Sequence, residues 1–227
     1  RSRAAAEAWL EALGARSGAS MLGTIFHAQP PPSALRTTLH SDAALRGTVA
    51  PAIANNLYGD YCVLPLRGTR YHALPIVALE FAGEGPLNLL RFGPQLRNAT
   101  VIVLPCDSLV APTVLTSVAR SSKLLVFMHQ EFLKLPIVCE LLERLVASHE
   151  YGVGNPVTDK LSRGDIDDAC DILRHLHLHP CDLGVTAEMT AYMDMVMDFY
   201  DSLTREQRAL PFLHLARSAR VPSVAAA

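Results

Sequence analysis

The 227-residue chain lacks the features that assign many proteins to a class at once. Its five cysteines include no Cys-x-x-Cys pair, which argues against a zinc ribbon and against a disulfide framework. No apolar run approaches the roughly 18 residues that suggest a membrane span. The phosphate loop, the dinucleotide-binding fingerprint, the zinc-protease helix and the serine-hydrolase elbow are absent too. The usual sequence support for nucleotide-dependent enzymes and zinc proteases is therefore missing.

Charged residues are also scarce, at 19% of the chain, whereas 50% of the residues are hydrophobic. The chain is long enough to bury a large core without disulfides or metals. A lone monomer would have difficulty covering all of its apolar surface, which favours association with other copies or with a partner protein. We expect a single domain over residues 1–227, with a possible division into a sheet-containing part, 1–130, and a helical part, 131–227.

The net charge of −2 is unevenly distributed along the chain. Residues 1–105 contain nine arginines and no lysine against six acidic residues, and residues 106–227 contain eleven basic against sixteen acidic residues. No block of lysine and arginine occurs, so we expect neither nucleic-acid nor membrane contact, and no cofactor. Five scattered cysteines are typical of a reducing compartment, which predicts an intracellular location or one within a virion.

Short apolar or alternating runs predict a mixed sheet over about residues 61–129. The runs are 61–67, 71–81, 87–92, 100–104 and 124–128. The β-branched run 100–104 suits a strand buried on both faces. The 19 residues between it and the run 124–128 fit a parallel crossover. We therefore predict one βαβ unit at 100–128, in a fold of the α/β or α+β class.

The C-terminal half reads as helical, whereas residues 36–58 suggest only one or two short helical turns. Pro136 suits the first turn of a helix that runs to about residue 150. Ser162 or Asp165 begins the next helix and Thr186 a third. A capping box over residues 204–207 opens a fourth.

Four possible zinc ligands lie close together near the end of the second of these helices. His175, His177 and His179 alternate with leucines, and Cys181 follows Pro180. Imidazole and thiolate are good zinc ligands, and an extended segment would point the three imidazoles to one side. Histidines at a helix C-terminus also satisfy the helix dipole without any metal. We favour the dipole and assign no metal site, with these four residues as the candidates for one.

A second candidate site follows from the predicted parallel strands. Cys106 follows the first of them and His129 ends the second, and functional groups gather outside the carboxyl ends of such strands. A thiol beside an imidazole can become a nucleophilic thiolate, with Asp107 or Glu131 to orient the imidazole. The alternative is that Cys106 is a small hydrophobic residue that closes a strand. We favour that alternative and assign no catalytic residue.

The sequence is thus interpreted as a structural or interaction subunit of a larger assembly, which buries apolar surface against copies of itself or another protein. Its bias toward alanine, leucine, proline and arginine resembles that of structural proteins from viruses with GC-rich genomes, including capsid-associated proteins. The alternative is an enzyme that uses Cys106 and His129, or a zinc site within residues 175–181.

Overall fold

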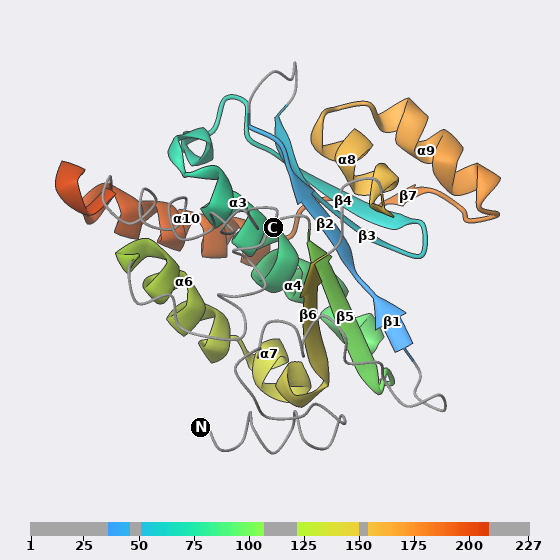
Figure 1. The fold of residues 1–227 in the computed structure, drawn as a ribbon, viewed down its shortest axis with the longest axis horizontal. Coiled ribbons are helices and arrows are strands. Elements are labelled where there is room, and N and C mark those ends of the chain that lie inside the picture. Colours follow the sequence, from blue (N-terminus) through green and yellow to red (C-terminus); the bar gives the residue numbers. More distant parts are fainter. Residues whose placement is uncertain (1–35, 46–50, 107–121, 150–153, 209–227) are drawn as a thin grey trace, which may run out of the picture.

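The computed structural model describes residues 36–45, 51–106, 122–149 and 154–208. These residues form a three-stranded sheet and a four-stranded sheet, which β1 and β2 join into one mixed β-sheet with helices on both of its faces (Figure 1). The strands are β1 (Arg36–Thr38), β2 (His40–Ala43), β3 (Ala52–Leu57), β4 (Asp60–Pro65), β5 (Val101–Cys106), β6 (Leu145–His149) and β7 (Cys181–Asp182). The arrangement is that of the predicted α/β class.

β1 and β2 together act as the central strand of this sheet. Only Leu39 separates them, and its N–H donates to the carbonyl of Val103 in β5 at 2.9 Å. β1 pairs with β5 in parallel, and β5 pairs with β6 in parallel. On the other side, β2 is antiparallel to β3 and β3 is antiparallel to β4, while β7 adds to β4 in parallel. Successive strands therefore lie on opposite sides of the central strand, β3 and β4 on one side and β5 and β6 on the other.

β3 and β4 form a hairpin around a two-residue turn, Tyr58-Gly59. The φ angles are 53° at Tyr58 and 98° at Gly59. Two-residue hairpin turns of this kind require positive φ at both positions, which glycine adopts without strain. A Cβ atom at Gly59 would lie 2.8 Å from the carbonyl oxygen of His179. The turn therefore also packs tightly against the segment that leads into β7.

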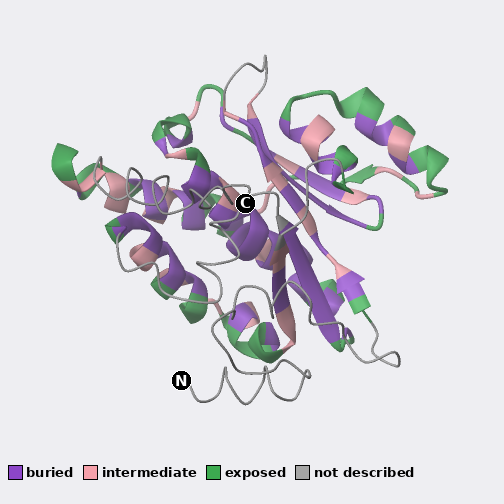
Figure 2. Cartoon of the chain, in the orientation of Figure 1, coloured by how far each residue is buried: buried purple, intermediate pink, exposed green. Residues whose placement is uncertain are grey.

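Helices cover the two faces of the sheet unequally. The helical elements are η1 (Arg70–Ala73), α3 (Ile76–Ala82), η2 (Gly83–Leu87), α4 (Asn88–Phe92), η3 (Gly93–Leu96), α6 (Lys123–Lys134), α7 (Pro136–Leu141), η4 (Leu142–Arg144), α8 (Pro156–Ser162), α9 (Ile166–His175) and α10 (Ala187–Ser202). The larger core lies between one face and the helices α3, α4, α6, α7 and α10, and includes Phe81, Phe92 and Phe132. A smaller core places α8 and α9 against Ala54 and Tyr61 on the other face. Figure 2 shows the resulting buried layer along the strands.

The strands predicted over residues 71–81 and 87–92 are wrong. η1 and α3 occupy most of the first range, and α3, a π-helical turn in η2 and α4 form one helical run. Pro86 has no N–H to donate within the helix, and the carbonyl of Gly83 in the same turn accepts a hydrogen bond from the side chain of Asn55 at 2.9 Å. Most residues of this run are buried, so its sequence lacks the polar face that identifies a surface helix.

The predicted βαβ unit exists, but it is longer than residues 100–128. The predicted strand 124–128 is wrong because it lies in α6, whose first turn is capped by Ser122 through a 3.2 Å hydrogen bond from the N–H of Leu125. The predicted helix 136–150 is wrong in its second half, because the chain turns through η4 into β6. The crossover from β5 thus passes through α6 and α7 before it reaches its parallel partner, β6.

The remaining predictions have mixed outcomes. The helical turns expected within 36–58 are wrong, since this range contains β1, β2 and β3. The strand expected at 61–67 corresponds to β4, and the strand expected at 100–104 corresponds to β5. The hydroxyl of Thr186 caps α10, as expected, by accepting from the N–H of Met189 at 3.3 Å. Thr204 and Gln207 make the two reciprocal hydrogen bonds of the predicted capping box.

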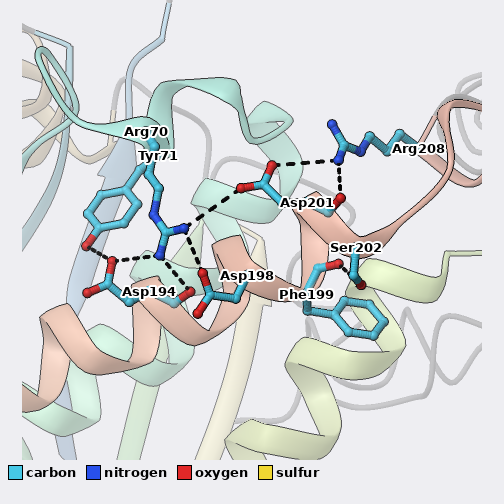
Figure 3. Close-up of polar contacts among 8 residues, drawn as sticks. All are labelled: Arg70, Tyr71, Asp194, Asp198, Phe199, Asp201, Ser202 and Arg208. Carbon is cyan, nitrogen blue, oxygen red and sulfur yellow. Dashed lines mark hydrogen bonds and ion pairs between the residues drawn. The ribbon is translucent and has the colours of Figure 1, made fainter.

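α10 is fixed to the rest of the fold by an acidic stripe (Figure 3). Arg70 in η1 contacts Asp194 at 3.3 Å, Asp198 at 2.6 Å and Asp201 at 3.8 Å. The hydroxyl of Tyr71 also donates to Asp194 at 2.9 Å. These contacts join η1 to α10. Within the described part of the chain, no helix has the length and apolar character needed to cross a membrane.

Candidate functional site

The four candidate zinc ligands do not converge in the structure. His175 ends α9, where its Nδ1 lies 2.7 Å from the carbonyl oxygen of Asp171, and Cys181 lies in β7. His177 adopts a φ of 59°, so the segment is not extended there. Across the described ranges, no group of three or more His, Cys, Asp or Glu side chains is arranged to hold a metal ion.

The prediction that His129 ends a strand is wrong. Cys106 does end a parallel strand, β5. His129 lies inside α6 and is 7% exposed. The residue that stands opposite Cys106 in the parallel register of β5 and β6 is His149. Asp107 falls outside the described residues. The nucleophilic role of Cys106 and His129 therefore stays a prediction that has lost its topological basis.

Asp42 lies near the carboxyl end of the central strand. β2 and β5 run in the same direction, and the strands that follow β2 in the chain lie first on one side of the central strand and then on the other. In open α/β sheets, ligands bind outside the carboxyl ends of strands at such a reversal of strand order. Asp42 is partly exposed and lies on the same face of the sheet as Ala54, where α8 packs.

A row of buried polar contacts attaches α8 to this part of β2. Asn155, which precedes α8, donates through Nδ2 to the carbonyl of Ser41 at 2.8 Å. Thr158 donates to the side-chain oxygen of Asn155, and Ser162 donates to Oδ2 of Asp42. Asn155 is 6% exposed, and the other two donors are completely buried. Because buried hydrogen bonds of this kind require defined geometry, they hold the Asp42 carboxylate in one orientation.

A second carboxylate and a guanidinium lie on α8 and its C-terminal cap, close in sequence to Ser162, which contacts Asp42. Arg163, at the end of α8, contacts Oδ1 of Asp159 at 2.6 Å through Nη2 and at 2.9 Å through Nε. These hydrogen bonds hold the pKa of Arg163 above its ordinary value, and the nearby charge of Asp42 adds to the effect. The side chains of Asp159 and Arg163 are 37% and 53% exposed. The three residues, Asp42, Asp159 and Arg163, are hereafter called the carboxylate site.

The opposite face of β2 and β3 carries a separate polar network inside the larger core. Asn55 donates to Oδ1 of Asn88 at 2.8 Å, and Asn88 donates to the carbonyl of Glu84 at 3.1 Å. Asn55 and Asn88 are completely buried. With the bond from Asn55 to Gly83, this network fixes the π-helical turn against β3, so its role is structural.

Sequence reasoning missed the whole carboxylate site. The signal available was the order His40-Ser41-Asp42-Ala43, in which exposure alternates in the structure as in a half-buried strand. Without a strand assigned there, Asp42 had no place in the fold. Asp159 and Arg163 resembled an ordinary i,i+4 pair on a surface helix.

Comparisons with known proteins gave no relative from which the site could be assigned. No protein-family model matches the chain, and neither the curated proteins nor the solved structures contain a match.

Proposed function

We propose that the carboxylate site binds a divalent cation together with a phosphate ester and catalyses hydrolysis of that ester. The observation that carries the proposal is that α8 brings two carboxylates to the carboxyl end of the central strand: Asp42 accepts from Ser162, and Asp159 contacts Arg163, the next residue, at 2.6 Å. These carboxylates would supply oxygen ligands for a cation at the edge of the sheet where open α/β folds bind ligands.

The chemistry of Mg²⁺ fits this small number of ligands. Mg²⁺ prefers oxygen ligands, keeps several waters, and is commonly held by one or two carboxylates plus the phosphate of the substrate. A set of three protein ligands is therefore not required. The cation would polarise a phosphoryl oxygen and orient an attacking water. Water would form the new P–O bond and lose a proton to the solvent as the P–O bond to the alcohol breaks, and the departing oxygen would take up a proton from the solvent.

The decisive experiment is calorimetric titration of MnCl₂, as a substitute for Mg²⁺, into the full chain. We expect Asp42→Asn to weaken binding by about tenfold or more. Asp171→Asn is the matched control, because Asp171 also pairs with an arginine at 2.6 Å but lies on exposed α9. Absence of Mn²⁺ binding to the unaltered chain, or equal weakening by both substitutions, would reject the proposal.

Activity is then measured on a panel of phosphodiesters with and without Mg²⁺. The panel comprises single- and double-stranded DNA, RNA, an RNA–DNA duplex and bis(p-nitrophenyl) phosphate. We expect cleavage of at least one member, dependent on Mg²⁺ and abolished by Asp42→Asn. Cleavage that survives Asp42→Asn would place the chemistry elsewhere.

A second candidate function is that of an assembly subunit, which associates with copies of itself or with another protein subunit, in a reducing compartment or a virion. Its support is the exposure of two large apolar side chains on adjoining loops, Tyr58 at 61% and Leu176 at 60%. The N–H of Cys181 donates to the carbonyl of Gly59 at 3.1 Å, which holds these loops together. Tyrosine on a fixed backbone is a common interface anchor. A capsid-associated protein is one form of this proposal.

Sedimentation velocity over a range of concentrations tests the assembly proposal. We expect a mass above that of the monomer, reduced by the double substitution Tyr58→Ser and Leu176→Ser. Leu142→Ser is the control, because Leu142 is a 40% exposed leucine in a different element, η4. A monomer at all concentrations, with no other protein bound, would count against this function.

A further inference from the structure

We infer that a buried water molecule binds between β2, β3 and the π-helical turn, held by the hydroxyl of Ser41 and the side-chain oxygen of Asn55. The water joins the central strand to the polar network that Asn55 forms with Asn88. Because neighbouring residues of a strand point to opposite faces, Ser41 and Asp42 lie on different faces of the sheet. The inference therefore does not depend on the proposed hydrolysis.

Two polar atoms in this part of the larger core have no hydrogen-bond partner among the described residues. They are Oγ of Ser41 and Oδ1 of Asn55. Ser41 is 1% exposed and Asn55 is completely buried. A buried polar atom without a partner is costly, and native proteins satisfy such atoms with ordered water where the chain itself does not. The two atoms together therefore indicate a bound water rather than a dry contact.

The orientation of the Asn55 amide is fixed by its other contacts. Its Nδ2 donates to the carbonyl of Gly83 at 2.9 Å and to Oδ1 of Asn88 at 2.8 Å. Since Nδ2 carries two hydrogens, these two bonds use its full donor capacity. A flipped amide would place an oxygen against the carbonyl of Gly83, where neither atom can donate. Oδ1 of Asn55 must therefore accept from another group.

Ser41 and Asn55 stand directly opposite each other in the antiparallel register of β2 and β3. Both lie beside Gly83, because Asn55 bonds to its carbonyl and Oγ of Ser41 lies 3.9 Å from the place that a Cβ atom of Gly83 would take. Opposite side chains on one face of a sheet have Cβ atoms about 5 Å apart, so a single water can reach both. Water can donate to Oδ1 of Asn55 and can also accept from the hydroxyl of Ser41, which suits both atoms.

The test combines a high-resolution crystal structure of the full chain with magnetic relaxation dispersion of water oxygen, which counts long-lived waters in solution. We expect an ordered water within hydrogen-bond distance of Oγ of Ser41 and Oδ1 of Asn55. Ser41→Ala should remove one long-lived water. It should also raise the unfolding equilibrium constant about fivefold, because the water loses one of the groups that hold it.

Ser122→Ala is the matched control. Ser122 is also a completely buried serine, but its Oγ accepts from the N–H of Leu125 within the chain. Ser122→Ala should destabilise the protein as the loss of a helix cap does, and should leave the number of long-lived waters unchanged.

Several outcomes would overturn the inference. A direct hydrogen bond between Ser41 and Asn55 in the crystal, or a metal ion or no water between them, would do so. A Ser41→Ala protein at least as stable as the unaltered chain would also reject it, because removal of an unsatisfied hydroxyl costs nothing. Loss of a water from both serine variants would place that water elsewhere. If Ser41→Ala does not fold, the crystal structure of the unaltered chain decides.

Discussion

Tyr71 and Asp194 are joined by a 2.9 Å hydrogen bond although 123 positions separate them in the chain. Tyr71 lies in η1, just after the sheet hairpin, and Asp194 lies in the middle of α10. Tyr71 is only 6% exposed. The bond is thus a partly buried connection between η1 and α10, shown beside the exposed ion pairs of Arg70 in Figure 3.

The substitution Tyr71→Phe should lower the free energy of unfolding at pH 7 by about 1–2 kcal/mol, because it removes a hydrogen bond to a charged acceptor and keeps the ring. Urea unfolding measures the change. Tyr58→Phe is the control, since its hydroxyl makes a longer bond of 3.3 Å from an exposed side chain. A loss equal to that of the control would show that the bond to Asp194 contributes nothing specific.

The same tyrosine predicts a dependence of stability on alkaline pH. Burial and the bond to Asp194 raise the pKa of Tyr71 to about 12. Because the folded state favours the protonated phenol, this contribution is complete below the ordinary pKa of about 10 and is lost as the pH rises toward 12. Between pH 9 and pH 12, the free energy of unfolding should therefore fall less steeply for Tyr71→Phe than for the unaltered chain. Parallel pH profiles would contradict this assignment.

Gly59→Ala should be strongly destabilising, by about 2 kcal/mol or more, because positive φ and a close contact act together. The new Cβ would lie 2.8 Å from the carbonyl oxygen of His179. Gly68→Ala isolates the effect of φ, since Gly68 has a φ of 77° and no atom within 4 Å of the built Cβ. Thermal unfolding should show a loss of about 1 kcal/mol for Gly68→Ala. Equal losses of stability for the two substitutions would mean that small shifts of the chain near His179 remove the close contact at little cost.

Asn55 and Asn88 should show coupled contributions to stability. Each replacement by alanine should cost about 2 kcal/mol, because it leaves a buried polar group without its partner. The double replacement should cost less than the sum by about 1 kcal/mol, since the remaining partner is then absent as well. Chemical denaturation of the four proteins completes this cycle. Additive losses would show that the 2.8 Å bond between the two side chains is unimportant.

The fold could be predicted where local composition and burial agree. The β-branched run from Val101 indicated β5 because that strand is buried on both faces, and Thr186 indicated the start of α10 because its hydroxyl caps the helix directly. The strand predictions within residues 76–92 were wrong because a helix that is buried on nearly all sides has no polar stripe in its sequence. β6 was missed because its register depends on β5, which is distant in the sequence.

The carboxylate site could not be predicted because its residues meet only through the packing of α8 on β2. Asp42 and Ser162 are 120 positions apart, and neither lies in a recognisable motif. The histidines near His177 were singled out through composition alone, and they form no group of three metal-holding side chains within the described part of the chain. Proximity in sequence therefore did not indicate proximity in the fold, whereas Asp42 and Ser162 are in contact although they lie far apart in the sequence.

The π-helical turn in η2 also sets the angular phase between α3 and α4. Each residue of an α-helix advances the side chains by about 100°, whereas a π-helical turn spreads one extra residue over nearly the same rotation. Deletion of one residue from Gly83–Leu87, with a return to α-helical geometry, would therefore leave α4 in nearly the same phase relative to α3. Leu89 and Phe92, which are completely buried, would then still face the core. In this stretch, the π-helical turn lets the chain carry an additional residue without rotating the apolar face that follows it.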